Sequence, residues 1–423
     1  MKLAVIGGGS TYTPELVAGL ARERERIGLR EIVLHDIDPE RREIVGGLAQ
    51  RMLAAAGYDG SLLVTDELDR AVSDASFVLV QLRVGGQAAR LGDETIPLAC
   101  GCIGQETTGA GGLAKALRTV PVVLEIAARV SELAADAWIV DFTNPVGIVT
   151  RSLRDAGHQA VGLCNVAIGI QRQIARLVGV TPDRVFVDQV GLNHLTWVRS
   201  VLIDGHEALP RLLADHGDEL AGGAGQSRAV LEELHAIPSY YLRYFYFHDA
   251  VLAEQRDGVP RAAAVAEIER ELLELYRDPS LTTKPKLLEQ RGGAFYSEAA
   301  TQLVASLSTG DRDVQVLDLR NNGALPGLAG DDVVELPARI EREGPVPLSQ
   351  PPLPPEMLGL VQHVAAYERL AAAAAVSGDR TLVHKALLAH PLIGQVPQAD
   401  ELVDALLTGG AEHLPQFQRG ALA

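Results

Sequence analysis

The sequence predicts an α/β protein with a doubly wound parallel sheet in its first part and a larger, mixed, helix-rich second part. Short β-branched apolar runs alternate with longer helical patterns up to about residue 180. These runs are almost continuously apolar, as in parallel strands that helices cover on both faces. From Val185 onward helical patterns dominate. We therefore predict two domains, residues 1–180 and 181–423, with the second closing over the first.

Six strands are predicted in the first domain, with helices between them. The strands are Leu3–Ile6, Ile32–Leu34, Leu62–Thr65, Phe77–Gln81, Trp138–Asp141 and Ala160–Leu163. The helical stretches include Glu15–Arg22, Pro39–Ala56 and Val122–Ala134. This alternation is typical of a doubly wound sheet. Arg83–Thr119 is rich in glycine, and we expect a long loop there in place of a simple crossover.

The second domain is expected to be mainly helical. The helical patterns are Gln226–Ala236, Arg261–Arg277, Glu298–Leu307 and Met357–Ser377, and the strand candidates are Phe186–Val190 and Val314–Leu317. Gly344–Pro355 is rich in proline and is predicted to run extended along the surface as a connector.

The charge and cysteine content exclude several classes of function. The chain has 423 residues, and 38 Lys+Arg against 55 Asp+Glu give a net charge of −17. Such a surface repels phosphate backbones, so we expect no nucleic-acid and no membrane partner, although local arginines can still hold a small phosphorylated ligand. Three cysteines cannot form a disulfide framework and fit a reducing cytoplasm, where we expect the protein to act.

A glycine-rich turn directly follows the first predicted strand and precedes a helix. Glycine there lets the backbone approach a pyrophosphate, which the helix N-terminus stabilises. At the end of the second strand, Asp36 is placed to bind a ribose diol, and a carboxylate there favours NAD over NADP. Asp38 is the alternative for this role. Strand, helix and acid together favour a nucleotide site over an ordinary loop. The candidate cofactor-binding residues are Gly7, Gly9, Ser10, Thr11 and Asp36.

Four polar segments follow predicted strands or lie in the glycine-rich region: residues 104–112, 141–145, 162–165 and 191–194. Ligands of open α/β sheets bind outside the carboxyl ends of the strands, so we expect three of these segments to converge there. Cys164 and His194 would suit a divalent metal with open positions for substrate, although each alone is as well explained by packing. Cys100 and Cys102 lack a nearby partner and are interpreted as structural.

The motifs GGGSTYTPEL, GQETTGAGGLAKALRTVP, DFTNPVGIVT, GLCN and GLNHLTW occur in this order, and together they resemble the NAD- and metal-dependent glycoside hydrolase family 4. The resemblance covers nearly the whole chain. It implies a Rossmann-like first domain of the lactate/malate dehydrogenase type and a second domain that binds substrate and metal and forms a homodimer or homotetramer. Asn165, directly after the cysteine, resembles the 6-phospho-β-glucosidase branch, because the α-glucosidase branch has aspartate there.

The resemblance implies NAD and a divalent metal, expected to be Mn²⁺, as cofactors, and a phosphorylated disaccharide or β-glucoside as substrate. Such enzymes are exceptions to the two-carboxylate glycosidases. In the chemistry that the resemblance implies, NAD⁺ takes hydride from C3 of the sugar, and the metal polarises the resulting ketone so that a base can remove the C2 proton. The C1–O bond then breaks by elimination, water adds, and NADH returns the hydride.

The resemblance also implies the catalytic and metal-binding residues. Cys164 and His194 match the metal ligands, and Tyr241 matches the catalytic base. Glu106 matches a position that tunes this tyrosine by hydrogen bonding. The residues alone do not single out Tyr241, since other tyrosines crowd the same helix start. These are Tyr240, Tyr244 and Tyr246.

Four further residues match substrate contacts of the family. Asn144 and Asn165 match positions that bind the sugar, and Arg90 matches a substrate contact. Arg261 matches the arginine expected at the 6-phosphate, where a planar guanidinium can hold two oxygens.

Three alternatives remain open at this point. One is another specificity within family 4, such as a 6-phospho-α-glucosidase or an α-galactosidase. A second is a 2-hydroxy-acid dehydrogenase of the lactate/malate type, which would produce NADH in net amounts. The third is a non-catalytic nucleotide-binding sensor, which would bind its ligand without releasing an aglycone.

Overall fold

A computed structural model describes residues 1–293 and 295–418 of the chain, so Ala294 and the last five residues of the predicted second domain lie outside the described residues. Its strands are β1 (Lys2–Ile6), β2 (Glu31–His35), β3 (Ser61–Thr65), β4 (Phe77–Val80), β5 (Trp138–Asp141), β6 (Ala160–Gly162), β7 (Val185–Leu192), β8 (Leu195–Ile203), β9 (His206–Glu207), β10 (Ile237–Pro238), β11 (Val314–Arg320), β12 (Val333–Glu341) and β13 (Gly344–Pro347).

The first half of the sheet is parallel and confirms the predicted α/β class. Its strand order is β3-β2-β1-β4-β5-β6, and every neighbouring pair is parallel. The order in which the chain adds strands reverses between β1 and β4, since β2 and β3 lie on one side of β1 and β4, β5 and β6 on the other. The crevice outside the carboxyl ends of the strands at such a point is where ligands bind in doubly wound sheets. Buried apolar residues fill β1, β2 and β4 almost without interruption, as predicted.

The helices are α1 (Thr13–Glu23), α2 (Pro39–Ala55), α3 (Leu68–Val72), α4 (Gly86–Ala99), α5 (Gly109–Leu133), α6 (Val146–Asp155), α7 (Val166–Val178), α8 (Leu209–Ala224), α9 (Arg228–Leu234), α10 (Arg243–Tyr246), α11 (His248–Asp257), α12 (Arg261–Tyr276), α13 (Leu288–Arg291), α14 (Tyr296–Thr309), α15 (Pro355–Ser377), α16 (Arg380–Ala389), α17 (Val396–Gly409) and α18 (Pro415–Gln418). Short 3₁₀ turns cover Pro182–Arg184, Tyr240–Leu242 and Ala411–His413. No helix in the described part is long and apolar enough to cross a membrane.

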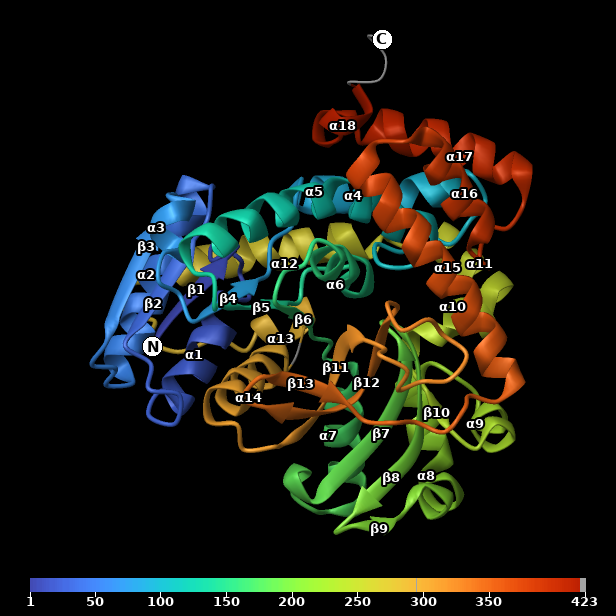
Figure 1. Cartoon of the computed structure of the whole chain (residues 1–423), viewed down its shortest axis with the longest axis horizontal. Helices are drawn as coiled ribbons and strands as arrows, with labels where there is room; N and C mark the ends of the chain where they lie inside the picture. Colours follow the sequence, from blue (N-terminus) through green and yellow to red (C-terminus); the bar gives the residue numbers. More distant parts are fainter. Residues whose placement is uncertain (294, 419–423) are drawn as a thin grey trace.

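The sheet continues without a break into an antiparallel half. β11 joins β6 where Asp318 lies opposite Gly162, and β12 joins β7 where Glu335 lies opposite Gly191. In Figure 1 the antiparallel strands β7, β8 and β9 lie below the parallel half, and the C-terminal helices α15, α16 and α17 run beside α4 and α5. The division of the chain at residue 180 stays a prediction, since one sheet runs through both parts.

The prediction of a long loop over Arg83–Thr119 was wrong. Most of this segment is helix, in α4 and the start of α5. Some of its glycines adopt a positive φ, as at Gly101 with +77°, and others allow close approach: a Cβ on Gly111 would lie 2.3 Å from the carbonyl oxygens of both Asp93 and Gln105. Arg118 locks the two helices together, with its Nη1 donating to Asp93 Oδ1 at 2.7 Å.

The proline-rich segment Gly344–Pro355 is only partly a surface connector. Its first four residues form β13, which pairs antiparallel with β12 at an edge of the sheet. Proline is tolerated on an edge strand because an unpaired position there needs no N–H donor. Pro355 then opens α15, whose first-turn proline lacks an N–H that would in any case be unpaired.

Candidate active site

A cavity of about 590 Å³ opens where the strands β4, β5 and β6 end. The structure brings together in its lining all six residues predicted for catalysis and substrate binding: Arg90, Glu106, Asn144, Asn165, Tyr241 and Arg261. They come from segments spread over about half of the chain. The carboxyl ends of parallel strands meet at one edge of the sheet, which is why residues after different strands converge here.

The cavity is rich in arginine although the protein as a whole is acidic. Five arginines and three glutamates line it, Arg83, Arg90, Arg243, Arg261 and Arg291 with Glu94, Glu106 and Glu254. The net charge of the chain is −17. A local excess of guanidinium groups in a cleft can attract and hold an anion against an opposing overall field. The cavity therefore suits a phosphorylated ligand.

Glu106 lies at the centre of a buried group of three cations. Lys115 Nζ lies 2.7 Å and Arg90 Nε 3.2 Å from its carboxylate oxygens, and Arg83 pairs with it as well. Burial would raise the pKa of Glu106, but Arg83, Lys115 and Arg90 hold it well below its usual value. Burial and the adjacent Arg83 lower the pKa of Lys115 to about 7. Glu106 is thus ionised, and its predicted hydrogen bond to Tyr241 stays a prediction.

Tyr241 lies flat against His194. Their ring centroids are 3.6 Å apart with an angle of 11° between the planes. Desolvation, followed by the nearby Cys164, raises the pKa of Tyr241 well above its usual value, and Arg90 acts in the opposite direction. A metal cation bound beside the phenol would act in the same direction as Arg90 and lower the pKa of Tyr241 toward the range that a base needs.

His194 is oriented for ligation by its neighbours. It occupies the two-residue turn between β7 and β8 with a φ of +63°, a left-handed conformation that is uncommon outside glycine. Its Nδ1 lies 2.9 Å from Thr107 Oγ1, whose own hydroxyl donates to Gln105 Oε1 at 2.7 Å. Since that oxygen's hydrogen is already used, Nδ1 carries the proton and Nε2 keeps its lone pair. Burial lowers the pKa of His194 to about 3, so the imidazole is neutral.

Cys164 follows β6 and is buried. Burial, with Glu335 and Asp318 close by, raises the pKa of its thiol well above the usual value. A thiolate and a neutral imidazole are a donor set that divalent transition metals accept, so the residues present fit a metal site. No cluster of three or more His, Cys, Asp or Glu residues suited to an ion occurs within residues 1–293 and 295–418. Cys164 and His194 as the two protein ligands would leave further coordination positions for substrate.

Two buried acids behind this pair were not predicted. Asn193, the residue before His194, donates from Nδ2 to Glu335 Oε2 at 2.8 Å and to Asp318 Oδ2 at 3.4 Å. Burial raises the pKa of Glu335 to about 7 and, together with Glu335, that of Asp318 well above its usual value. These bonds fix the turn that carries His194. The sequence does contain a signal for both acids: each interrupts an otherwise apolar strand pattern, in VLDLR and in VVELP.

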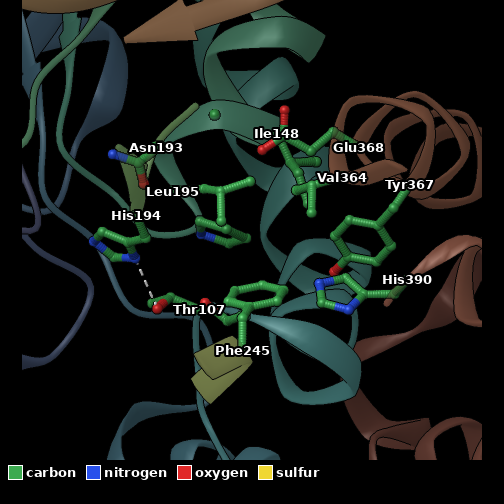
Figure 2. A pocket seen from close by; sticks show the side chains of 13 residues that line it. Thr107, Ile148, Asn193, His194, Leu195, Phe245, Val364, Tyr367, Glu368 and His390 are labelled. Atoms are coloured by element: carbon green, nitrogen blue, oxygen red, sulfur yellow. Dashed lines mark hydrogen bonds between the residues drawn. The ribbon is translucent and has the colours of Figure 1, made fainter. Parts of the chain in front are cut away.

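A second, much smaller cavity lies behind His194. Its volume is about 20 Å³, room for a single water molecule. Figure 2 shows Thr107 beside His194, Tyr367 next to His390 on the far side, and Phe245 between the two groups. Tyr367 Oη donates to the Gly109 carbonyl at 3.0 Å, and Gly109 N donates to His390 Nε2 at 3.2 Å. This cavity is too small for a sugar, and its lining anchors the start of α5.

The predicted cofactor turn has the shape that a dinucleotide needs. Gly7 has a φ of +89°, and a Cβ there would lie 2.9 Å from the Gln81 carbonyl oxygen. Gly9 N donates to Asp36 Oδ2 at 2.8 Å. Asp38 Oδ1 caps α2, accepting from two backbone N–H groups at 3.0 Å, and Asp36 Oδ1 in turn accepts from Asp38 N at 3.0 Å, so Asp36 stays the predicted residue for the ribose and Asp38 the alternative.

The five candidate cofactor residues differ in exposure. Gly7, Ser10 and Asp36 are partly exposed at the turn, whereas Gly9 and Thr11 are buried. Arg291 Nε donates to Thr11 Oγ1 at 2.7 Å. Because Arg291 also lines the large cavity, the turn and the cavity adjoin, as a cofactor that reacts with the substrate requires.

Comparisons with known proteins agree with this geometry. Residues 2–180 match the family model "Family 4 glycosyl hydrolase", and residues 189–393 match the model of its C-terminal domain. A probable 6-phospho-β-glucosidase of Bacillus subtilis is 41% identical, over 99% of this chain and 98% of the relative. A 6-phospho-β-glucosidase of Escherichia coli is 35% identical, over 99% of this chain and 97% of the relative.

Solved structures are similar over almost the whole length. The 6-phospho-β-glucosidase of Thermotoga maritima, solved with NAD and glucose-6-phosphate and in another crystal with manganese as well, has a TM-score of 0.92 in the first of these forms. It is 35% identical, and the match covers 98% of this chain and 99% of the other. Malate dehydrogenase of Plasmodium falciparum, at 14% identity and a TM-score of 0.57, shares the fold alone.

Proposed function

The chain belongs to family 4 of the glycosyl hydrolases, and from this membership we propose that it hydrolyses 6-phospho-β-glucosides with NAD and a divalent metal, Mn²⁺, as cofactors. The observation that carries the proposal is the large cavity, because six residues predicted from the family motifs line it. His194 stacks on Tyr241 of this lining, Cys164 directly precedes Asn165 of the lining, and Arg291 of the lining donates to Thr11, next to the glycine-rich turn. The substrate would be a phosphorylated disaccharide or an aryl β-glucoside phosphate.

The β-configuration is supported by the residue after the cysteine and by the relatives. Asn165 stands where the α-glucosidase branch has aspartate. The relatives from Bacillus subtilis and Escherichia coli named above are β-enzymes at 41% and 35% identity. Maltose-6′-phosphate glucosidases among the relatives are about 27% identical.

Each residue of the cavity has a chemical task in this reaction. When bound, NAD⁺ accepts and returns a hydride, and the divalent metal polarises the sugar oxygen next to the C2 proton. Tyr241 removes that proton, and Arg90, which lowers the pKa of the phenol, supports the phenolate. Arg261, exposed at the start of α12, binds the 6-phosphate. Asn144 and Asn165 hydrogen-bond the sugar hydroxyls. The predicted homodimer or homotetramer and the cytoplasmic location stay predictions.

Four nitrophenyl glucosides test the function. The protein with NAD⁺, Mn²⁺ and a thiol reductant is incubated with the 6-phospho-β, 6-phospho-α, unphosphorylated β and unphosphorylated α compounds. We expect nitrophenol release from the 6-phospho-β compound, without net formation of NADH. Release from another of the four alone would point to a different specificity of the family. Net NADH with a 2-hydroxy acid and no nitrophenol would support the dehydrogenase alternative.

Replacing Arg261 with alanine should raise the KM for a 6-phospho-β-glucoside by about tenfold to a hundredfold, because one charge-assisted contact to phosphate is lost. The weak turnover of an unphosphorylated β-glucoside should be unchanged. Arg277→Ala is the matched control, since Arg277 lies at the opposite end of α12 and pairs with Glu40. Equal effects on both substrates would refute the assignment of Arg261 to the phosphate.

A further inference from the structure

Two arginines follow the turn that carries Asp36, and both are tied to carboxylates. Arg42 Nη1 donates to the Asp36 carbonyl at 2.8 Å, and its Nη2 lies 2.9 Å from Asp66. Arg41 Nη2 lies 3.2 Å from Glu269 Oε2, a partner 228 residues further along the chain. Each of the two guanidinium groups is therefore held in place by a carboxylate from a segment outside α2.

This position matters for the choice between two dinucleotides. NADP differs from NAD by a phosphate on the ribose 2′-oxygen, and an arginine near the end of the second strand is what accommodates that phosphate in doubly wound folds. The Cβ of Arg41 lies at the proposed ribose site: a Cβ built on Gly9 would be 2.8 Å from both Arg41 Cβ and Asp36 Cγ. A free Arg41 guanidinium would therefore be within reach of a 2′-phosphate.

Glu269 is well placed to prevent this. It lies on α12, is buried, and also accepts from Arg291 Nη2 at 2.9 Å. Burial would raise the pKa of Glu269, but Arg291 and Arg41 hold it below its usual value, so the carboxylate is ionised. On the cavity side, Glu269 Oε1 accepts directly from Arg291 Nε at 3.1 Å and from Thr11 Oγ1 at 3.3 Å, whereas Arg41 is held at the other oxygen, Oε2, on the side of the turn.

We propose that Glu269 determines specificity for NAD over NADP by holding the Arg41 guanidinium away from the site of the 2′-phosphate. Glu269 is a positioning residue in this scheme, because it acts through Arg41 and does not touch the cofactor. It adds to the direct repulsion between Asp36 and a 2′-phosphate. The inference rests on the proposed binding of NAD.

Calorimetric titration of the Mn²⁺-loaded protein with NAD⁺ and with NADP⁺ tests the proposal. In Glu269→Gln, the Kd for NADP⁺ divided by the Kd for NAD⁺ should fall about tenfold, since Arg41 then keeps, among the described residues, only its longer contact with Asp38, 3.9 Å from Nε to Oδ2, and can turn to the phosphate. Adding Arg41→Ala to this variant should restore the wild-type ratio. Glu267→Gln is the matched control on the same helix, because Glu267 is exposed and pairs only with its neighbour Arg270 in the described structure.

The outcomes separate this inference from the proposed function. An unchanged ratio in Glu269→Gln, or a lowered ratio that persists when Arg41 is also removed, would overturn the role of Glu269. Should Glu269→Gln fail to fold by circular dichroism, Glu269→Asp keeps the charge beside Arg291 and should still lower the ratio, by about threefold. Wild-type protein that binds neither dinucleotide would overturn the proposed cofactor itself.

Discussion

Replacing Tyr241 with phenylalanine should lower kcat for the 6-phospho-β-glucoside by about 10²–10⁴-fold, the range that a positioned general base contributes. The phenylalanine ring can keep the stacking contact with His194, whose centroid lies 3.6 Å from that of Tyr241. Only the oxygen that takes the C2 proton is lost. The Kd values for Mn²⁺ and NAD⁺, measured by calorimetry, should therefore stay within about twofold of the wild-type values, and KM should change little.

Tyr246→Phe is the control for this variant. Tyr246 belongs to the same tyrosine cluster, but its oxygen accepts a hydrogen bond from Trp197 Nε1 at 3.1 Å and does not line the large cavity. Removing the Tyr246 hydroxyl should lower the free energy of unfolding and leave kcat near the wild-type value. Retention of full kcat by Tyr241→Phe would show that another group removes the proton, and an equal loss in both variants would reduce the effect to packing.

Replacing Cys164 with serine should weaken Mn²⁺ binding by roughly a hundredfold or more and abolish activity at low metal concentration. Removing an outer partner of a metal ligand already costs about 10–100-fold, and Cys164 is proposed as a direct ligand. The exchange of sulfur for oxygen is nearly isosteric, so the melting temperature of the metal-free protein should be almost unchanged. Electron paramagnetic resonance of free Mn²⁺ in a titration measures the affinity.

Cys102→Ser is the matched control for the metal site. Cys102 is equally buried, but it lies in the connection between α4 and α5, where its thiol is directed to the Cys100 carbonyl. This variant should bind Mn²⁺ as the wild-type protein does. If Cys164→Ser kept wild-type Mn²⁺ affinity, or if Cys102→Ser lost as much, the assignment of Cys164 as a metal ligand would fail.

The parallel half of the fold was predictable because its physical signal is local. A strand such as β4 is buried on both faces and must be apolar throughout, and a run like Phe77–Val80 shows this directly in the sequence. The convergence of Asn144 and Asn165 on one cavity followed from the same reasoning, since both follow neighbouring parallel strands.

The remaining features depend on contacts that no local pattern contains. The joining of the two halves rests on single pairings, such as Asp318 opposite Gly162. The helical structure around Gly111 depends on how closely α5 approaches a carbonyl of α4. Likewise, Lys115 and Arg83 look like ordinary surface charges in the sequence, and only the folded chain shows that both face Glu106.

The proposed reaction depends above all on removal of the C2 proton, and hydrolysis in D₂O with NAD⁺ and Mn²⁺ tests this step most directly. The glucose 6-phosphate that is produced is examined by NMR for deuterium at C2. Since Tyr241 takes the C2 proton and the same carbon later regains one from solvent, the account predicts deuterium at C2. A product that keeps protium at C2, together with a covalent glycosyl-enzyme detected by mass spectrometry, would contradict it.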